Sequence, residues 1–138
     1  MTALGFLHSP QTGDVYLCNA GHLPPLRRRN GKVERLDQGR DIPIGVLREH
    51  AFSNHRYDGV NGDLLVFYTD GITEARNADG VEFGIESLEA ILARSPLSTP
   101  EALLSSMLAQ LHAHQGSSIG NDDQTLIVLR LAGAPRTA

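Results

Sequence analysis

Residues 62–71 read GDLLVFYTDG and join an uninterrupted apolar run to an acidic turn. A short continuous run such as Leu64–Tyr68 is typical of a strand that is buried on both faces. Asp70 follows this run almost directly, and Gly71 indicates a tight turn or a close backbone approach. A carboxylate at the end of a core strand is costly unless a cation or hydrogen bonds compensate it. Asp70 is therefore either a turn residue that accepts backbone N–H groups or a ligand of a cation.

A second acidic turn, Asn121-Asp122-Asp123, precedes another continuously apolar segment at residues 125–131. Adjacent carboxylates repel each other unless a cation or hydrogen bonds compensate them, although this pattern alone also fits a plain turn before a strand. If the two apolar strands are neighbours in one sheet, Asp70 and Asp122 point into a common site. Their oxygen ligands suit Mg²⁺ or Mn²⁺. Zinc is not expected, because Cys18 is isolated and the histidines lack paired spacing.

The remaining pattern predicts mostly antiparallel strands, then two helices and a last strand. Strands are expected at residues 3–7, 15–20, 26–29, 32–36, 51–57, 63–69 and 125–131. Asn30-Gly31 is the preferred pair for a tight hairpin, because both central residues need positive φ. This order indicates the α+β class rather than alternating βαβ units.

Two helices are expected from apolar residues at helical spacing. The first includes Ile85, Leu88, Ile91 and Leu92, and the second Leu104, Met107, Leu108 and Leu111. The second is expected to begin at Ser98 or Thr99, with Pro100 in its first turn. Residues 112–121 read as a flexible polar loop.

Composition places the chain among ordinary globular proteins, with 138 residues, 41% of them hydrophobic and 20% charged. A net charge of −4 gives no electrostatic reason for a nucleic acid or an anionic membrane as main partner. No stretch approaches the roughly 18 apolar residues of a membrane span, and no signal peptide is expected. The single cysteine, Cys18, favours a reducing cytoplasm. The basic cluster Arg27–Arg29 reads as a solvated hairpin tip or as a docking patch for an acidic or phosphorylated partner.

Four segments resemble, in order, those of SpoIIE-type phosphatases of the PP2C (PPM) superfamily. Residues 19–26, NAGHLPPL, resemble the NAGHxPPL segment, and residues 62–77 resemble GDxLxxYTDGxTEARN. Residues 79–84 are similar to the stretch that follows, and residues 122–130, DDQTLIVLR, resemble the closing DDxTLLVLR strand. The TDG and DDxT blocks are specific together, whereas either alone would be weak.

The resemblance implies a PP2C-like sandwich of two antiparallel sheets flanked by helices. Residues 1–132 would be the C-terminal part of the phosphatase domain, and residues 133–138 a disordered tail. It also implies two Mn²⁺ or Mg²⁺ ions that activate a water for attack on phosphoserine or phosphothreonine. The implied substrate is a phosphorylated regulatory protein such as an anti-sigma-factor antagonist.

By the same resemblance, Asp70 and Asp122 would each bind one ion, and Asp123 would be a neighbour that orients the site. Gly71, His22 and Glu74 are further candidates for lining it. His22 could act as a general acid, but a structural hydrogen-bonding role is the main alternative. For Glu74 the alternative is a capped loop with a local ion pair that involves Arg76.

The family's domain begins before the first residue of this chain, and its first half supplies an aspartate that bridges both metals. Gly13-Asp14-Val15 lacks the glycine and histidine of the family's GDVxGHG-like segment. The alternative function is therefore a truncated or degenerate, non-catalytic phosphatase-like module that binds a partner in a sigma-factor switch. An incomplete sheet would also expose strand edges, which favours self-association.

Overall fold

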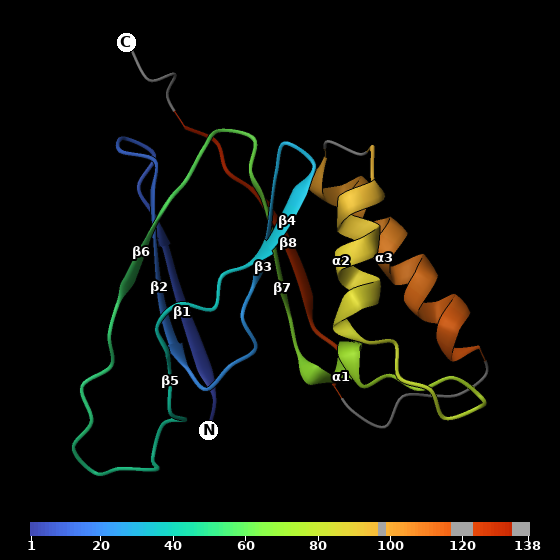
Figure 1. Cartoon of the computed structure of the whole chain (residues 1–138), viewed down its shortest axis with the longest axis horizontal. Coiled ribbons are helices and arrows are strands. Elements are labelled where there is room, and N and C mark those ends of the chain that lie inside the picture. Colours follow the sequence, from blue (N-terminus) through green and yellow to red (C-terminus); the bar gives the residue numbers. More distant parts are fainter. Residues whose placement is uncertain (97–98, 117–122, 134–138) are drawn as a thin grey trace.

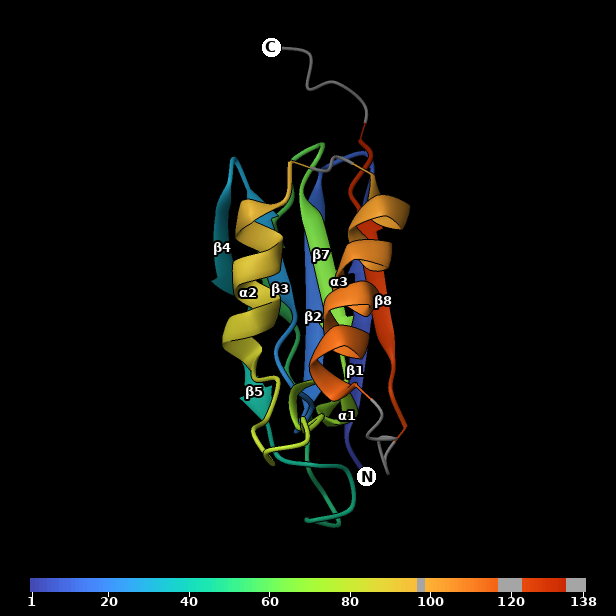
Figure 2. The same ribbon diagram turned by 90° about the vertical axis from the view of Figure 1, so that its right-hand side faces the viewer.

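A computed structural model describes residues 1–96, 99–116 and 123–133, which form three layers (Figures 1 and 2). Two sheets pack face to face, and helices cover the outer face of one of them. The α+β class is confirmed. Predictions for Ser98, Asp122 and the tail from residue 134 lie outside the described residues. No helix within the described ranges is long and apolar enough to cross a membrane.

The first sheet is built around a central strand, β2 (Asp14–Ala20). On one side β2 pairs antiparallel with β1 (Ala3–His8). On the other side it pairs antiparallel with β6 (His55–Asp58) and, further along, parallel with β5 (Arg40–Asp41). The strand predicted over 51–57 thus starts only at His55. It pairs where Asp14–Leu17 of β2 offers a free edge.

The second sheet has the order β4 (Lys32–Arg35), β3 (Leu26–Arg29), β7 (Leu64–Tyr68), β8 (Leu126–Arg130), and every pair in it is antiparallel. The Asn30-Gly31 hairpin is confirmed, with φ of 50° and 79°. β7 is buried on both faces as predicted. Leu65 packs into the core between the sheets, and Leu64 and Val66 pack into the core under the helices.

Helices α2 (Ile85–Arg94) and α3 (Pro100–Gln115) cover the outer face of this second sheet (Figure 2). Thr99 is the N-cap of α3, and its side chain accepts the Ala102 N–H at 3.3 Å.

The fully buried apolar stripe of α3 is Leu103, Met107 and Leu111, whereas the predicted Leu104 and Leu108 are only half-buried. α3 also extends through Gln115 to a C-cap at Gly116 (φ 57°), so a loop from residue 112 is wrong. No proline or glycine interrupts the sequence before that glycine, and the helix therefore continues.

The sandwich is confirmed with its helices on one outer side only, as far as the described residues show. No helix among the described residues covers the outer face of the first sheet, and Leu7 on β1 is 64% exposed there. The two sheets are joined by apolar packing between them. In it the rings of Phe6 and Phe67 meet edge-on, with their centroids 5.4 Å apart. β1 and β8 are edge strands within the described chain. Self-association through such edges stays a prediction.

Candidate metal centre

Asp70 lies just beyond the end of β7, at the end of the sandwich drawn lowest in Figure 1. It begins the short helix α1 (Asp70–Thr73), which was not predicted because four residues carry no helical period. One Asp70 carboxylate oxygen accepts the N–H of Gly71 at 3.0 Å. Asp70 is exposed. It therefore acts as a turn residue through one oxygen while its carboxylate stays at the surface.

Hydrogen bonds connect this turn to the residues just before β8. Thr69 Oγ1 donates to the Asp123 carbonyl at 3.1 Å and accepts the Thr125 N–H at 3.0 Å. Gln124 Nε2 donates to the Gly71 carbonyl at 3.1 Å. We call residues 69–71 and 123–125 together the strand-end site. Each contact involves a main-chain group, so the site fixes the backbone on both sides.

Gly71 is required in this site by a close approach of two backbones. Its own position is buried, and a Cβ added to it would lie 2.4 Å from the Asp123 carbonyl oxygen. That distance is well inside van der Waals contact, and backbone cannot rotate away as a side chain can. The predicted tight approach at Gly71 is therefore present, and its partner is the second acidic segment.

The expectation that the two acidic turns share one end of a sheet is confirmed for the residues that the structure describes. β7 and β8 pair antiparallel with Tyr68 opposite Leu126, so the end of β7 meets the start of β8. Asp70 and Asp123 both flank this point and both are exposed. Asp122 lies outside the described residues.

Carboxylate oxygens are the donors that a hard cation prefers, so the chemistry of Asp70 and Asp123 fits Mn²⁺ or Mg²⁺. Within residues 1–96, 99–116 and 123–133, no group of three or more His, Cys, Asp or Glu side chains is arranged to hold a metal. Metal binding by Asp70 and Asp123 therefore stays a prediction.

His22 lies at the same end, in the turn that crosses from the first sheet to the second. Buried Asn19 accepts the His22 N–H at 2.8 Å and donates to the His22 carbonyl at 3.1 Å. Gly21 has φ of 72°, and a Cβ there would lie 2.6 Å from Pro43 Cγ. The backbone around His22 is therefore rigidly held, and the role of its imidazole stays a prediction.

Tyr68 connects this crossing segment to β7. Its hydroxyl donates to the Pro24 carbonyl at 3.0 Å, and burial raises the pKa of Tyr68 to about 12. A phenol with that pKa stays protonated at neutral pH and remains a donor. The segment that carries His22 therefore runs beside Tyr68, the last residue of β7, which precedes Asp70 by two residues.

Glu74 and Arg76 do not form the ion pair that their proximity suggested. Glu74 is exposed, and its N–H donates to the Asp70 carbonyl at 2.7 Å. Arg76 pairs instead with Glu82 and donates to the Gly80 carbonyl at 2.7 Å. The loop is closed locally, as predicted, but through Glu82.

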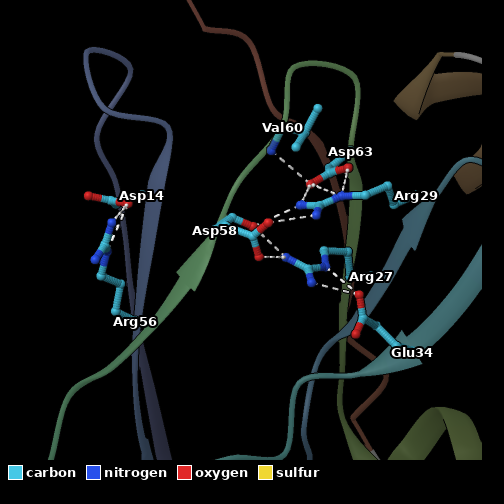
Figure 3. Close-up of polar contacts among 8 residues, drawn as sticks. All are labelled: Asp14, Arg27, Arg29, Glu34, Arg56, Asp58, Val60 and Asp63. Carbon is cyan, nitrogen blue, oxygen red and sulfur yellow. Dashed lines mark hydrogen bonds and ion pairs between the residues drawn. The ribbon is translucent and has the colours of Figure 1, made fainter.

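The opposite end of the sandwich holds an ion-pair network of Arg27, Arg29, Glu34, Asp58 and Asp63 (Figure 3). Arg29 forms a two-pronged pair with Asp63, at 2.9 Å from Nε and 2.6 Å from Nη2. Asp63 is 2% exposed and also accepts the Val60 N–H at 2.9 Å. Arg27, at 6% exposed, contacts Glu34 at 2.7 Å.

This network overturns the prediction of a solvated hairpin tip for two of the three arginines. Side chains alternate along β3, so Arg27 and Arg29 face the first sheet and meet Asp58, the last residue of β6. The Arg29 guanidinium holds the pKa of Asp58 below its usual value. The charges of Arg27 and Arg29 are therefore compensated by carboxylates of the same chain.

Asp14, the first residue of β2, also lies at this far end (Figure 3). Its carboxylate is 2.8 Å from Arg56 Nη2, and the hydrogen bond from Arg56 lowers the pKa of Asp14. The acid of Gly13-Asp14-Val15 is therefore paired with an arginine of the neighbouring strand β6.

Sequence reasoning missed Thr69, Gln124 and Asn19 as residues that shape the site. Each is a polar residue inside one of the resembling segments, adjacent to an acid or close to His22. That position was an available signal. A cavity of about 720 Å³ between α2 and α3 is separate, since none of its lining residues belongs to the strand-end site.

Comparison with known proteins gives a consistent family and fold. The profile of the family described as Stage II sporulation protein E (SpoIIE) matches residues 1–132. Protein IcfG of Synechocystis sp. is 26% identical over 117 residues, which cover 85% of this chain and 18% of IcfG.

Two solved structures extend this likeness. The manganese-presoaked phosphatase domain of SpoIIE from Bacillus subtilis matches with a TM-score of 0.74 and 18% identity, over 98% of this chain and 59% of that one. The RsbU and RsbW domains of Rv1364c from Mycobacterium tuberculosis match with a TM-score of 0.71 and 27% identity, over 97% and 37%. The chain thus has the fold of a PP2C-type phosphatase domain and spans less than two thirds of each of these relatives.

Proposed function

The chain belongs to the stage II sporulation protein E (SpoIIE) family, and on this premise we propose that it is the C-terminal part of a metal-dependent protein serine/threonine phosphatase domain. The proposed substrates are phosphorylated regulatory proteins, such as an anti-sigma-factor antagonist. The fold shared with the SpoIIE phosphatase domain supports the phosphatase class. The single cysteine fits a reducing cytoplasm as the location.

The observation that carries this proposal is the joining of Asp70 and Asp123 to one end of the sheet. We propose that Asp70 and Asp122 each bind one Mn²⁺ or Mg²⁺ ion in the complete domain, with Asp123 as a weaker or orienting ligand. Such an ion, when bound, lowers the pKa of a coordinated water and stabilises charge on phosphate oxygens. Two ions are proposed for that complete domain.

In this proposal the chain's own residues position Asp70 and Asp123, which are both exposed. Thr69 and Gly71 fix the backbone of Asp70 against that of Asp123. His22 and Glu74 are proposed to line the same site together with Gly71. A fixed backbone matters because metal and phosphate chemistry tolerates only small errors in ligand position.

The test is Asp70→Asn in a polypeptide that joins this chain to the upstream half of the domain. We expect Mn²⁺-dependent hydrolysis of a phosphopeptide to fall about a hundredfold or more, since even outer-shell changes at metal sites cost 10–100-fold. Asp79→Asn is the matched control, because it removes the same charge from an exposed loop nearby. Unchanged turnover in Asp70→Asn would reject the ligand role.

A second candidate function is a non-catalytic phosphatase-like module that docks a partner in a sigma-factor switch. The pairing of Asp14 with Arg56 favours it, since the acid of the only GDV sequence is engaged far from the strand-end site. Calorimetric titration of the 138-residue chain with Mn²⁺ separates the candidates. Saturable binding of two ions would contradict the docking module.

A further inference from the structure

A small polar cavity lies at the far end of the helix-covered sheet, at the opposite end from Asp70. Its volume is about 300 Å³. The lining residues are Arg28, Asn30, Gly31, Gly62, Leu64, Pro96 and Arg130. They come from the β3–β4 hairpin, the start of β7, the end of β8 and the segment that follows α2.

Strand register places the two arginines of this cavity on either side of one leucine. Arg28 on β3 is directly opposite Leu64, and Leu64 is directly opposite Arg130 on β8. Directly opposed residues on neighbouring strands lie on the same face of a sheet, about 5 Å apart. Leu64 packs into the core under the helices, so both arginines belong to the helix-covered face.

The charge of this cavity differs from that of the ion-pair network close by. Arg27 and Arg29 face the first sheet and pair with its Asp58, whereas Arg28 faces the other way because side chains alternate along β3. The described lining residues include two arginines, one asparagine and no acidic residue. Arg28 and Arg130 also interact with other groups of the chain, so a ligand would share these side chains with the partners they already have.

We propose that this cavity binds a phosphate group, either as inorganic phosphate or as a phosphate ester on a protein. Two planar guanidinium groups suit a tetrahedral oxyanion, because each offers paired N–H donors. Side-chain positions at Gly31 and Gly62 are open space, so a ligand can approach the backbone there. The site is independent of the proposed phosphatase activity, and it would be a second phosphate contact remote from the strand-end site.

The experiment is a calorimetric titration of the metal-free 138-residue chain, in chelator and at constant ionic strength. One arm uses inorganic phosphate, and the other a phosphoserine peptide beside its unphosphorylated form. We expect saturable binding that Arg130→Gln weakens about tenfold, as loss of a charge-assisted pair implies. Arg48→Gln is the control, because it removes the same charge from an exposed residue in the loop that follows β5.

A second variant, Arg28→Lys, keeps the charge but removes the paired donors, and we expect an intermediate loss of affinity. Binding of inorganic phosphate identifies the free anion as a ligand, whereas binding of the phosphopeptide alone identifies a phosphorylated protein. The proposal is overturned if neither ligand saturates, or if Arg48→Gln weakens binding as much as Arg130→Gln. Because no metal is present, neither result bears on the Asp70 test of phosphatase activity.

Discussion

The two ends of the sandwich use acidic side chains in opposite ways. In the ion-pair network, Asp63 is 2% exposed and its carboxylate accepts hydrogen bonds from Arg29 and from the Val60 N–H. In the strand-end site, Asp70 and Asp123 are exposed, and most contacts there hold main-chain groups. At the network end the carboxylate is paired with hydrogen-bond donors. At the strand-end site the backbone is fixed by hydrogen bonds and the carboxylates stay exposed.

This difference separates stability from ligand binding. Removing one partner of a buried ion pair leaves the other charge uncompensated, and folding becomes much less favourable. Removing an exposed carboxylate changes folding little, although it removes an oxygen that a cation could use. We therefore expect substitution of a network carboxylate to affect mainly folding, and substitution of a strand-end carboxylate to affect mainly metal binding.

The largest expected effect on folding is that of Asp63→Asn. Arg29 would keep its charge but lose its two-pronged partner, so we expect the free energy of unfolding to fall by about 3 kcal/mol. The lower part of the usual range applies because the Arg29 side chain is 24% exposed and keeps Asp58 as a partner at 2.9 Å. Urea denaturation measures the change, with Asp79→Asn as the control. A loss below about 1 kcal/mol would show that the network contributes little.

The next largest effect is expected from Gly71→Ala, at the other end. The added methyl would meet the Asp123 carbonyl at 2.4 Å, and we expect a loss of about 2 kcal/mol from overpacking against backbone. Gly5→Ala is the matched control, because its Cβ would make ordinary contact at 3.6 Å with Cys18. Equal unfolding midpoints for the two variants would mean that the strand ends are not closely packed.

Asp70→Asn should change the free energy of unfolding by no more than about 0.5 kcal/mol, because Asp70 is exposed. Its amide oxygen can still accept the Gly71 N–H. The same variant is expected to weaken Mn²⁺ binding in the complete domain, measured by calorimetry. A destabilisation comparable to that of Asp63→Asn would contradict the division between the two ends.

The smallest effect concerns pH and the network. Because the Arg29 guanidinium lowers the pKa of Asp58 from its usual 3.8, the stabilisation from this pair is present above that value and is lost as pH falls through the lower folded pKa. We expect the acid limb of a stability–pH curve to be shallower in Asp58→Asn. Some slope should persist, since the pKa of Asp14 is also lowered. An unchanged acid limb would exclude Asp58 as a contributor.

Local pattern was enough to predict much of the fold. The apolar run at Leu64–Tyr68 and the Asn30-Gly31 hairpin are set by neighbours in sequence, and both are present. β5 and α1 were missed because two and four residues are too short to show a period. The stripe of α3 was displaced because Leu103, Leu104, Met107 and Leu108 allow two overlapping apolar faces, and only packing selects one.

The pairing of the two strands that precede and follow the acidic turns was predicted, but the contacts that support those turns were not. The predicted convergence of Asp70 and Asp122 stays a prediction, since Asp122 lies outside the described residues. The hydrogen bond from Thr69 to Asp123 spans 54 residues, and it depends on the register between β7 and β8. The contact of Arg27 with Asp58 likewise requires two sheets to face each other. Such pairings follow from three-dimensional register, which a single sequence does not display.

The Thr69 hydroxyl has a consequence for protein design. It accepts a hydrogen bond from the Thr125 N–H and donates one to the Asp123 carbonyl, so the spacing between Asp70 and Asp123 is set within the six residues of the strand-end site. Serine would preserve this arrangement and valine, of similar shape, would abolish it. A designer who grafts residues 69–71 and 123–125 onto the ends of another antiparallel strand pair would carry that spacing into a new scaffold.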